Sequence, residues 1–149
     1  MPKLVNSWTA SVLLKLGKLH SAEKQGERFR KLAEEARSQI AELSALETAA
    51  AIKRGALLID VREREEFLRG HIPNAIHLAR GTLELEIEKR APDPVTEIVL
   101  YCGAGNRSAL SAEALQRMGY NNVKSLAGGL QAWIDARFPT WRTRHPIED

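Results

Sequence analysis

Cysteine is nearly absent from this chain of 149 residues, which contains only Cys102. A single cysteine excludes an intrachain disulfide and a metal site built from several cysteines, and a free thiol suits a reducing compartment. No stretch approaches the roughly 20 apolar residues that cross a bilayer. Lys15 and Lys18 interrupt the apolar run near the N-terminus, and no clear cleavage site follows it, so no signal peptide is expected. These absences predict a soluble, cytoplasmic protein without a membrane span.

Aromatic residues make up only 5% of the chain and are not interleaved with basic residues. The net charge of +3 is unevenly placed. Residues 1–40 carry eight Lys or Arg and four Asp or Glu, whereas residues 41–149 carry fourteen and fifteen. A basic excess this mild, confined to one terminal segment, does not indicate nucleic-acid binding. No nucleic-acid partner is therefore expected.

From about residue 40 onward, short apolar runs alternate with short helical patterns. The run 56–61 is continuously apolar up to Asp60, as in a strand that is buried on both faces. This alternation predicts an α/β fold with a mainly parallel sheet and helices on both faces. We expect strands at 40–43, 56–61, 75–78, 98–101 and 123–126, and helices at 44–53, 63–68, 81–90, 108–118 and 130–136.

The first 38 residues are expected to form a helical extension. Small and apolar residues recur there at spacings of three and four, which indicates a weak helical seam. Such an arm packs on the domain or on another copy of the chain, or it docks to a partner or a membrane surface. The predicted parts are this extension (1–38), the α/β domain (39–138) and a tail (139–149). The seam comprises Ala22, Gly26, Phe29, Ala33, Ala36, Ile40 and Leu43.

Cys102 directly follows the predicted strand 98–101, at the sheet edge where open α/β folds bind ligands. Gly103 and Gly105 let the backbone curl around the sulfur, and Ser108 is expected to cap the next helix. Backbone amides, a positive helix end and a nearby guanidinium all favour a sulfur anion. We therefore expect Cys102 to be an exposed thiolate and a catalytic nucleophile. The expected substrate-binding residues are Gly103, Ala104, Gly105, Asn106, Arg107 and Ser108.

Several charged residues are expected near this edge, and two of them have both a functional and a structural interpretation. Arg107 either orients an anionic donor or clasps carbonyl groups of the loop. Asp60 ends a buried strand on the same side of the sheet, where it tunes the pocket or makes structural hydrogen bonds. Arg62 and Glu66 are expected in solvated or network contacts, and His71 is expected to fix a turn. Asp60, Arg62 and His71 are thus candidates for supporting the site from behind, and no metal ligand is expected.

Four segments, in order, resemble the single-domain rhodaneses, which are sulfurtransferases of the thiosulfate type. They are 58–63, 66–75, 101–108 and 126–133, and the likeness covers about residues 40–137. The resemblance implies a three-layer fold with five parallel strands. It also implies a cysteine that accepts a sulfane sulfur as a persulfide, without a cofactor. The expected reaction passes sulfur from a donor anion such as thiosulfate to cyanide or a thiol.

The loop from Cys102 to Arg107 has six residues, which matches the sulfurtransferases. The related phosphatases carry one residue more, and a wider loop suits a tetrahedral phosphate. Gly103 stands where thiosulfate-specific members often have a basic residue. Two alternatives follow: a persulfide carrier that docks a protein sulfur partner or self-associates through residues 1–38, and a cysteine-dependent phosphatase or arsenate reductase.

Overall fold

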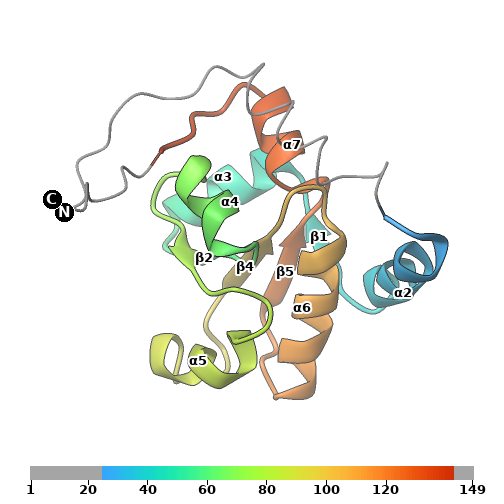
Figure 1. Ribbon diagram of the computed structural model, residues 1–149. Helices are drawn as coiled ribbons and strands as arrows, with labels where there is room; N and C mark the ends of the chain where they lie inside the picture. The colour runs from blue at the N-terminus through green and yellow to red at the C-terminus, as the bar shows by residue number, and fades with distance from the viewer. Residues whose placement is uncertain (1–24, 143–149) are drawn as a thin grey trace, which may run out of the picture.

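The computed structural model describes residues 25–142. Its strands form one parallel sheet in the order β1-β5-β4-β2-β3, which confirms the predicted α/β fold (Figure 1). The strands are β1 (Ala41–Leu43), β2 (Leu57–Asp60), β3 (Ile76–His77), β4 (Ile98–Tyr101) and β5 (Val123–Leu126). The helices are α2 (Glu27–Arg37), α3 (Ala45–Lys53), α4 (Arg64–Arg69), α5 (Leu83–Arg90), α6 (Asn106–Arg117) and α7 (Gly129–Asp135).

The sheet separates two apolar cores. Helices α5 and α6 pack on one face, and α3 and α7 pack on the other. Successive strand side chains point to opposite faces, so Ile98 and Leu100 of β4 enter one core while Val99 and Tyr101 enter the other. All four residues are fully buried. In the strand order, β4 is the central strand of the sheet. Cys102 follows directly at its carboxyl end.

Local signals explain most of the element boundaries. Ser44 and Glu47 form a capping box, as the sequence predicts, and α3 begins at the next residue after Ser44. Helix α6 begins at Asn106, two residues earlier than expected, because Gly105 adopts the left-handed conformation (φ 102°) and turns the chain directly into the helix. The prediction that Ser108 caps this helix is therefore wrong, since Ser108 lies inside its first turn.

Helix α2 lies beside α6 (Figure 1) and packs against it. Ala33 and Ala36 of the predicted seam are buried in this contact region. The described part of the predicted extension is thus packed on the domain, while residues 1–24 of that prediction, like tail residues 143–149, lie outside the described residues. No helix within 25–142 is long and apolar enough to cross a membrane.

Candidate active site

Cys102 lies beneath the loop that connects β4 to α6, and only 1% of its surface is exposed. The expectation of an exposed sulfur is therefore wrong. The loop folds back over the cysteine, and residues of the α5–α6 core pack against it. The sulfur therefore lies at the base of the loop and has little contact with solvent.

The Cys102 sulfur nevertheless faces polar groups. The Gly105 amide donates a hydrogen bond to Sγ at 3.1 Å and the Ser108 amide donates one at 3.4 Å. The Ser108 hydroxyl also lies 3.4 Å from Sγ. Among the described residues, the backbone amides that reach Sγ are thus one from the loop and one from the first turn of α6. Donors at the positive end of a helix stabilise a sulfur anion.

A second buried serine, Ser125, forms a hydrogen bond with Ser108. Ser125 of β5 and Ser108 are both fully buried, and their hydroxyl oxygens are 2.8 Å apart. Ser108 is the hydrogen-bond partner of the Ser125 side chain among the described residues, so the Ser125 proton is satisfied only when it points to Ser108. The Ser108 proton then has two acceptors at 3.4 Å, Cys102 Sγ and the Gly105 carbonyl oxygen, and an anionic sulfur is the stronger of the two. Ser125 is not among the predicted site residues, although a serine in a mostly apolar strand beside the cysteine strand indicates a polar neighbour for the site.

This serine pair makes a specific prediction. Ser125→Ala should slow alkylation of Cys102 by iodoacetamide at neutral pH by up to about fivefold, because one net hydrogen bond contributes roughly 1 kcal/mol. Ser108→Ala should slow it further, and Ser125→Ala should add nothing in the Ser108→Ala background. Ser111→Ala is the matched control, because the Ser111 hydroxyl bonds the Arg107 carbonyl and not the sulfur. Equal rates in all variants would contradict the proton arrangement.

Arg107 is tied to α4 and not to the loop carbonyls. Its Nη1 and Nη2 donate to the two carboxylate oxygens of Glu66 at 2.7 and 3.0 Å, and Glu66 is buried. Burial opposes the charge on the guanidinium, but the bonds to Glu66 and the charge of Cys102 outweigh it and raise the pKa of Arg107. The described hydrogen bonds thus do not support the carbonyl-clasp interpretation, while donor orientation by Arg107 stays a prediction.

Asp60, Arg62 and His71 form a buried group behind the site. Arg62 pairs with Asp60 through both Nε and Nη2 and also donates to the Gly70 carbonyl at 2.6 Å. His71 Nδ1 lies 2.9 Å from the Phe67 carbonyl, and burial lowers the pKa of His71. These contacts are structural hydrogen bonds of the predicted kinds. No group of three or more His, Cys, Asp or Glu within 25–142 could hold a metal ion.

Helix α7 supports the cysteine loop from the opposite side. The amides of Leu130 and Gln131 donate to the carbonyl groups of Cys102 and Gly103 at 2.8 and 3.1 Å. Gly129, with φ 59°, touches the same loop so closely that a Cβ there would lie 2.7 Å from the Gly103 carbonyl carbon. The sequence indicates a tight turn at Gly128 and Gly129, and the contact of this turn with the cysteine loop is a finding of the structure.

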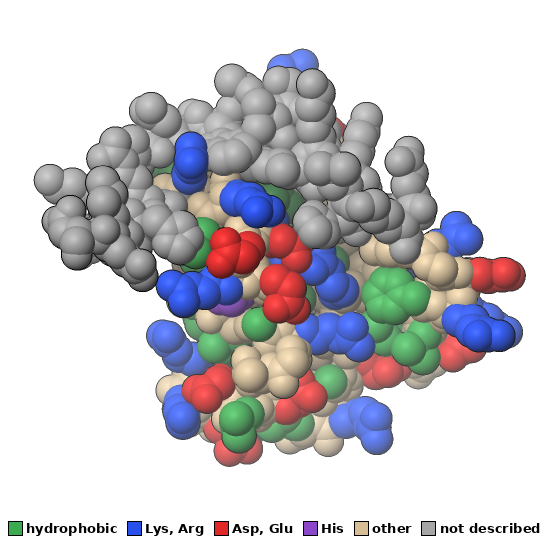
Figure 2. Space-filling model, viewed as in Figure 1, with side chains coloured by type: hydrophobic (Ala, Val, Ile, Leu, Met, Phe, Trp, Pro, Cys, Tyr) green, Lys and Arg blue, Asp and Glu red, His purple; other side chains and the backbone are tan. Residues whose placement is uncertain are grey.

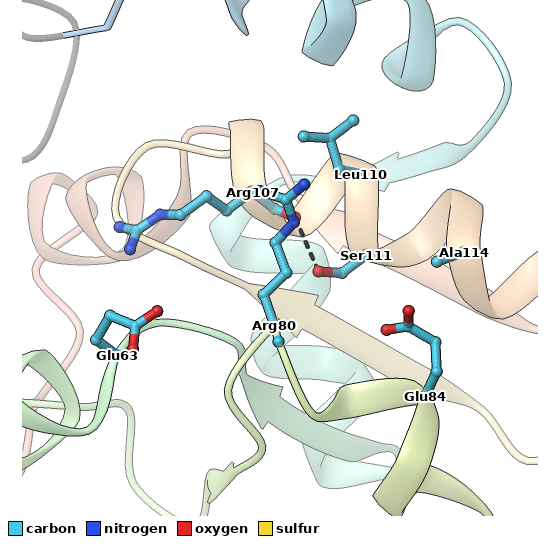
Figure 3. Close-up of a pocket in the computed structure, with 8 residues that line it drawn as sticks. Glu63, Arg80, Glu84, Arg107, Leu110, Ser111 and Ala114 are labelled. Atoms are coloured by element: carbon cyan, nitrogen blue, oxygen red, sulfur yellow. Dashed lines mark hydrogen bonds between the residues drawn. The ribbon is translucent and has the colours of Figure 1, made fainter.

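Beside Arg107 there is an open cleft of about 400 Å³ between α5 and α6. Arg80 extends across it toward α6, near Leu110 and Ser111 (Figure 3). Acidic and basic side chains lie side by side on this face of the molecule (Figure 2). The cleft is lined by Glu63, Arg80, Gly81, Glu84, Arg107, Leu110, Ser111 and Ala114.

The chain belongs to the rhodanese-like domain family, whose match spans residues 44–136. It is 40% identical over 98 residues to the adenylyltransferase and sulfurtransferase UBA4 of Candida albicans. That match covers 60% of this chain but only 22% of the relative.

Two solved structures are similar over most of their length. One is a protein of unknown function from Rhodopseudomonas palustris, described as a possible tyrosine phosphatase (33% identity, 80% of this chain and 96% of that one, TM-score 0.64). The other is the homodimeric polysulfide-sulfur transferase of Wolinella succinogenes (26% identity, 85% and 96%, TM-score 0.68). The family and the sulfurtransferase neighbour support sulfur transfer as the general activity.

Proposed function

We propose that this protein is a sulfurtransferase that carries a sulfane sulfur on Cys102 as a persulfide. The observation that carries the proposal is the sulfur at the end of β4, which receives hydrogen bonds from the Gly105 and Ser108 amides. The same donors suit a thiolate and a terminal persulfide anion, since both place negative charge on sulfur. The six-residue loop closed by Arg107 supports a single sulfur atom over a phosphate.

The proposed reaction has two steps. The Cys102 thiolate attacks the outer sulfur of thiosulfate, a new S–S bond forms, and sulfite leaves with the electron pair of the broken bond. Cyanide or a thiolate then attacks the terminal sulfur of the persulfide, and the Cys102 thiolate is restored. Neither step requires a proton, which fits a site where the described hydrogen bonds to Cys102 come from Gly105 and Ser108 and none comes from a histidine.

The proposed donor is a small anion with a sulfane sulfur. Arg107 supplies positive charge beside the loop, because the Nη2 atom lies within 3.4 Å of where a Gly103 side chain would begin. The absence of a basic side chain at Gly103 leaves Arg107 as the loop's own cation. Thiosulfate and polysulfide both have the required charge and chemistry, and the similar Wolinella protein is a polysulfide-sulfur transferase.

Steady-state kinetics test the proposal. Thiocyanate formation from thiosulfate or polysulfide and cyanide should give parallel double-reciprocal lines, as a ping-pong mechanism requires, and Cys102→Ser should form none. An aryl phosphate should not be hydrolysed. Phosphate hydrolysis without thiocyanate formation would favour the phosphatase class, which the description of the similar Rhodopseudomonas protein names.

A protein sulfur partner is part of the same proposal. Loading of Cys102 by a sulfur-donating protein, or self-association through residues 1–38, would place the chain in a sulfur relay. The cytoplasmic location expected from the single free thiol agrees with a protein thiol as partner, since thiols are kept reduced there.

A further inference from the structure

The cysteine loop is held by a helix that lies outside the family match. Asn106 is the first residue of α6, and its side chain lies between Gln25, which precedes α2, and Arg37, the last residue of α2. Arg37 Nη1 donates a hydrogen bond to Asn106 Oδ1, and Asn106 Nδ2 donates one to Gln25 Oε1 at 2.6 Å. The rhodanese-like match begins only at residue 44, so Gln25 and Arg37 lie outside that match.

The contact defines the orientation of the Asn106 side chain. A guanidinium has donors only, so Asn106 must turn its carbonyl oxygen to Arg37 and its NH₂ group to Gln25. The amide group is then engaged at both ends. Asn106 therefore cannot rotate about its side-chain bonds without breaking at least one hydrogen bond.

Asn106 lies between the two amides that reach the sulfur. The Gly105 amide comes directly before it in the chain, and the Ser108 amide comes two residues later. A backbone rotation at Asn106 would turn both N–H groups relative to Cys102. A displacement of about 1 Å in a reacting group can cost roughly a hundredfold in rate.

Hydrogen bonds, and not apolar contacts, fix the position of the Asn106 side chain. The apolar contact of α2 with the domain involves Ala33 and Ala36. Beside Asn106 there is an open groove of about 580 Å³, which Arg30, Lys31 and Arg37 line together with Glu27 and Glu34. The Asn106 side chain thus depends on its partners for its position.

We propose that Arg37 is a positioning residue for the chemistry of Cys102, which it affects through Asn106. Helix α2 thereby becomes part of the working active site, in addition to any role in docking a partner. The effect on sulfur transfer rests on the proposed function, whereas the effect on the reactivity of the thiol does not.

The test uses the full chain with Arg37→Met, Arg37→Lys and Asn106→Ala. Arg37→Met should lower kcat for thiosulfate roughly tenfold with little change in KM, and should move the pH profile of Cys102 alkylation to higher pH. Lysine retains a donor, so Arg37→Lys should restore most of both. Adding Arg37→Met to Asn106→Ala should have no further effect. Arg30→Met is the matched control, because Arg30 lines the groove on the same helix without bonding Asn106.

The two readouts separate the possible failures. A lower melting temperature for Arg37→Met with unchanged kcat and an unchanged alkylation profile would overturn the proposal and leave Arg37 a structural contact. A shifted alkylation profile in a protein that transfers no sulfur would support the positioning role and reject the proposed function instead. If the losses in kcat of Arg37→Met and Asn106→Ala added in the double variant, Arg37 would not act through Asn106.

Discussion

Replacing Gly129 with alanine should lower the free energy of unfolding by about 3 kcal/mol or more and reduce sulfur transfer at least tenfold. An added Cβ would lie 2.7 Å from the carbonyl carbon of Gly103 and 2.8 Å from the nitrogen of Ala104, and closer still to the carbonyl oxygen of Cys102. All three are backbone atoms, which cannot swing aside as a flexible side chain can. Either α7 or the cysteine loop must therefore shift, and the amides that face the sulfur move with the loop.

Gly55→Ala separates this clash from backbone strain. Gly55 also has a positive φ, 98°, but a Cβ there would meet nothing within 4 Å. Its substitution should cost only about 1 kcal/mol and leave activity unchanged. Urea denaturation of both variants, with activity measured on the folded protein, makes the comparison. Similar losses for Gly55 and Gly129 would show that the contact between α7 and the loop does not constrain the site.

Asp60→Asn should cost about 3–5 kcal/mol of stability, because it leaves the charge of Arg62 buried without its partner. Arg62 is only 6% exposed and Asp60 is fully buried. Burial by itself opposes the charge on Arg62, but Asp60 outweighs it and raises the pKa of Arg62. Asp60→Asn removes that support, but a guanidinium stays protonated near neutral pH even without a carboxylate partner, so the variant cannot relieve the defect by releasing a proton from Arg62.

A surface ion pair provides the control for this second prediction. Glu86 lies 3.4 Å from Lys89, and its side chain is 38% exposed. Glu86→Gln should change stability by less than about 0.5 kcal/mol, as exposed pairs within a helix usually do. Chemical denaturation of the two variants measures the difference. If Asp60→Asn were as mild as Glu86→Gln, the buried pair would not hold the segment behind the site.

Much of the fold was predictable because its signals are local. The apolar run before the cysteine predicts β4 at Ile98–Tyr101, where the structure has it. The Ser44 and Glu47 pair predicts the start of α3, since both partners of a capping box lie within one turn. The resemblance added the expectation of one sheet of five parallel strands, whereas the strand order came from the structure.

The site's finer geometry was not predictable, because it depends on residues far apart in the chain. Ser108 has the residue type of a helix cap, but the left-handed turn at Gly105 starts the helix earlier and turns the hydroxyl toward Cys102 and Ser125. Burial of Cys102 likewise depends on how the loop folds back. The link from Arg37 to Asn106 spans 69 residues, and no local pattern marks it.

The most direct test of the account is the intact mass of the protein before and after incubation with thiosulfate or polysulfide. The account predicts a gain of one sulfur atom, which cyanide removes and which Cys102→Ser never acquires. An unchanged mass with every sulfane donor, or a gain that persists in Cys102→Ser, would contradict it.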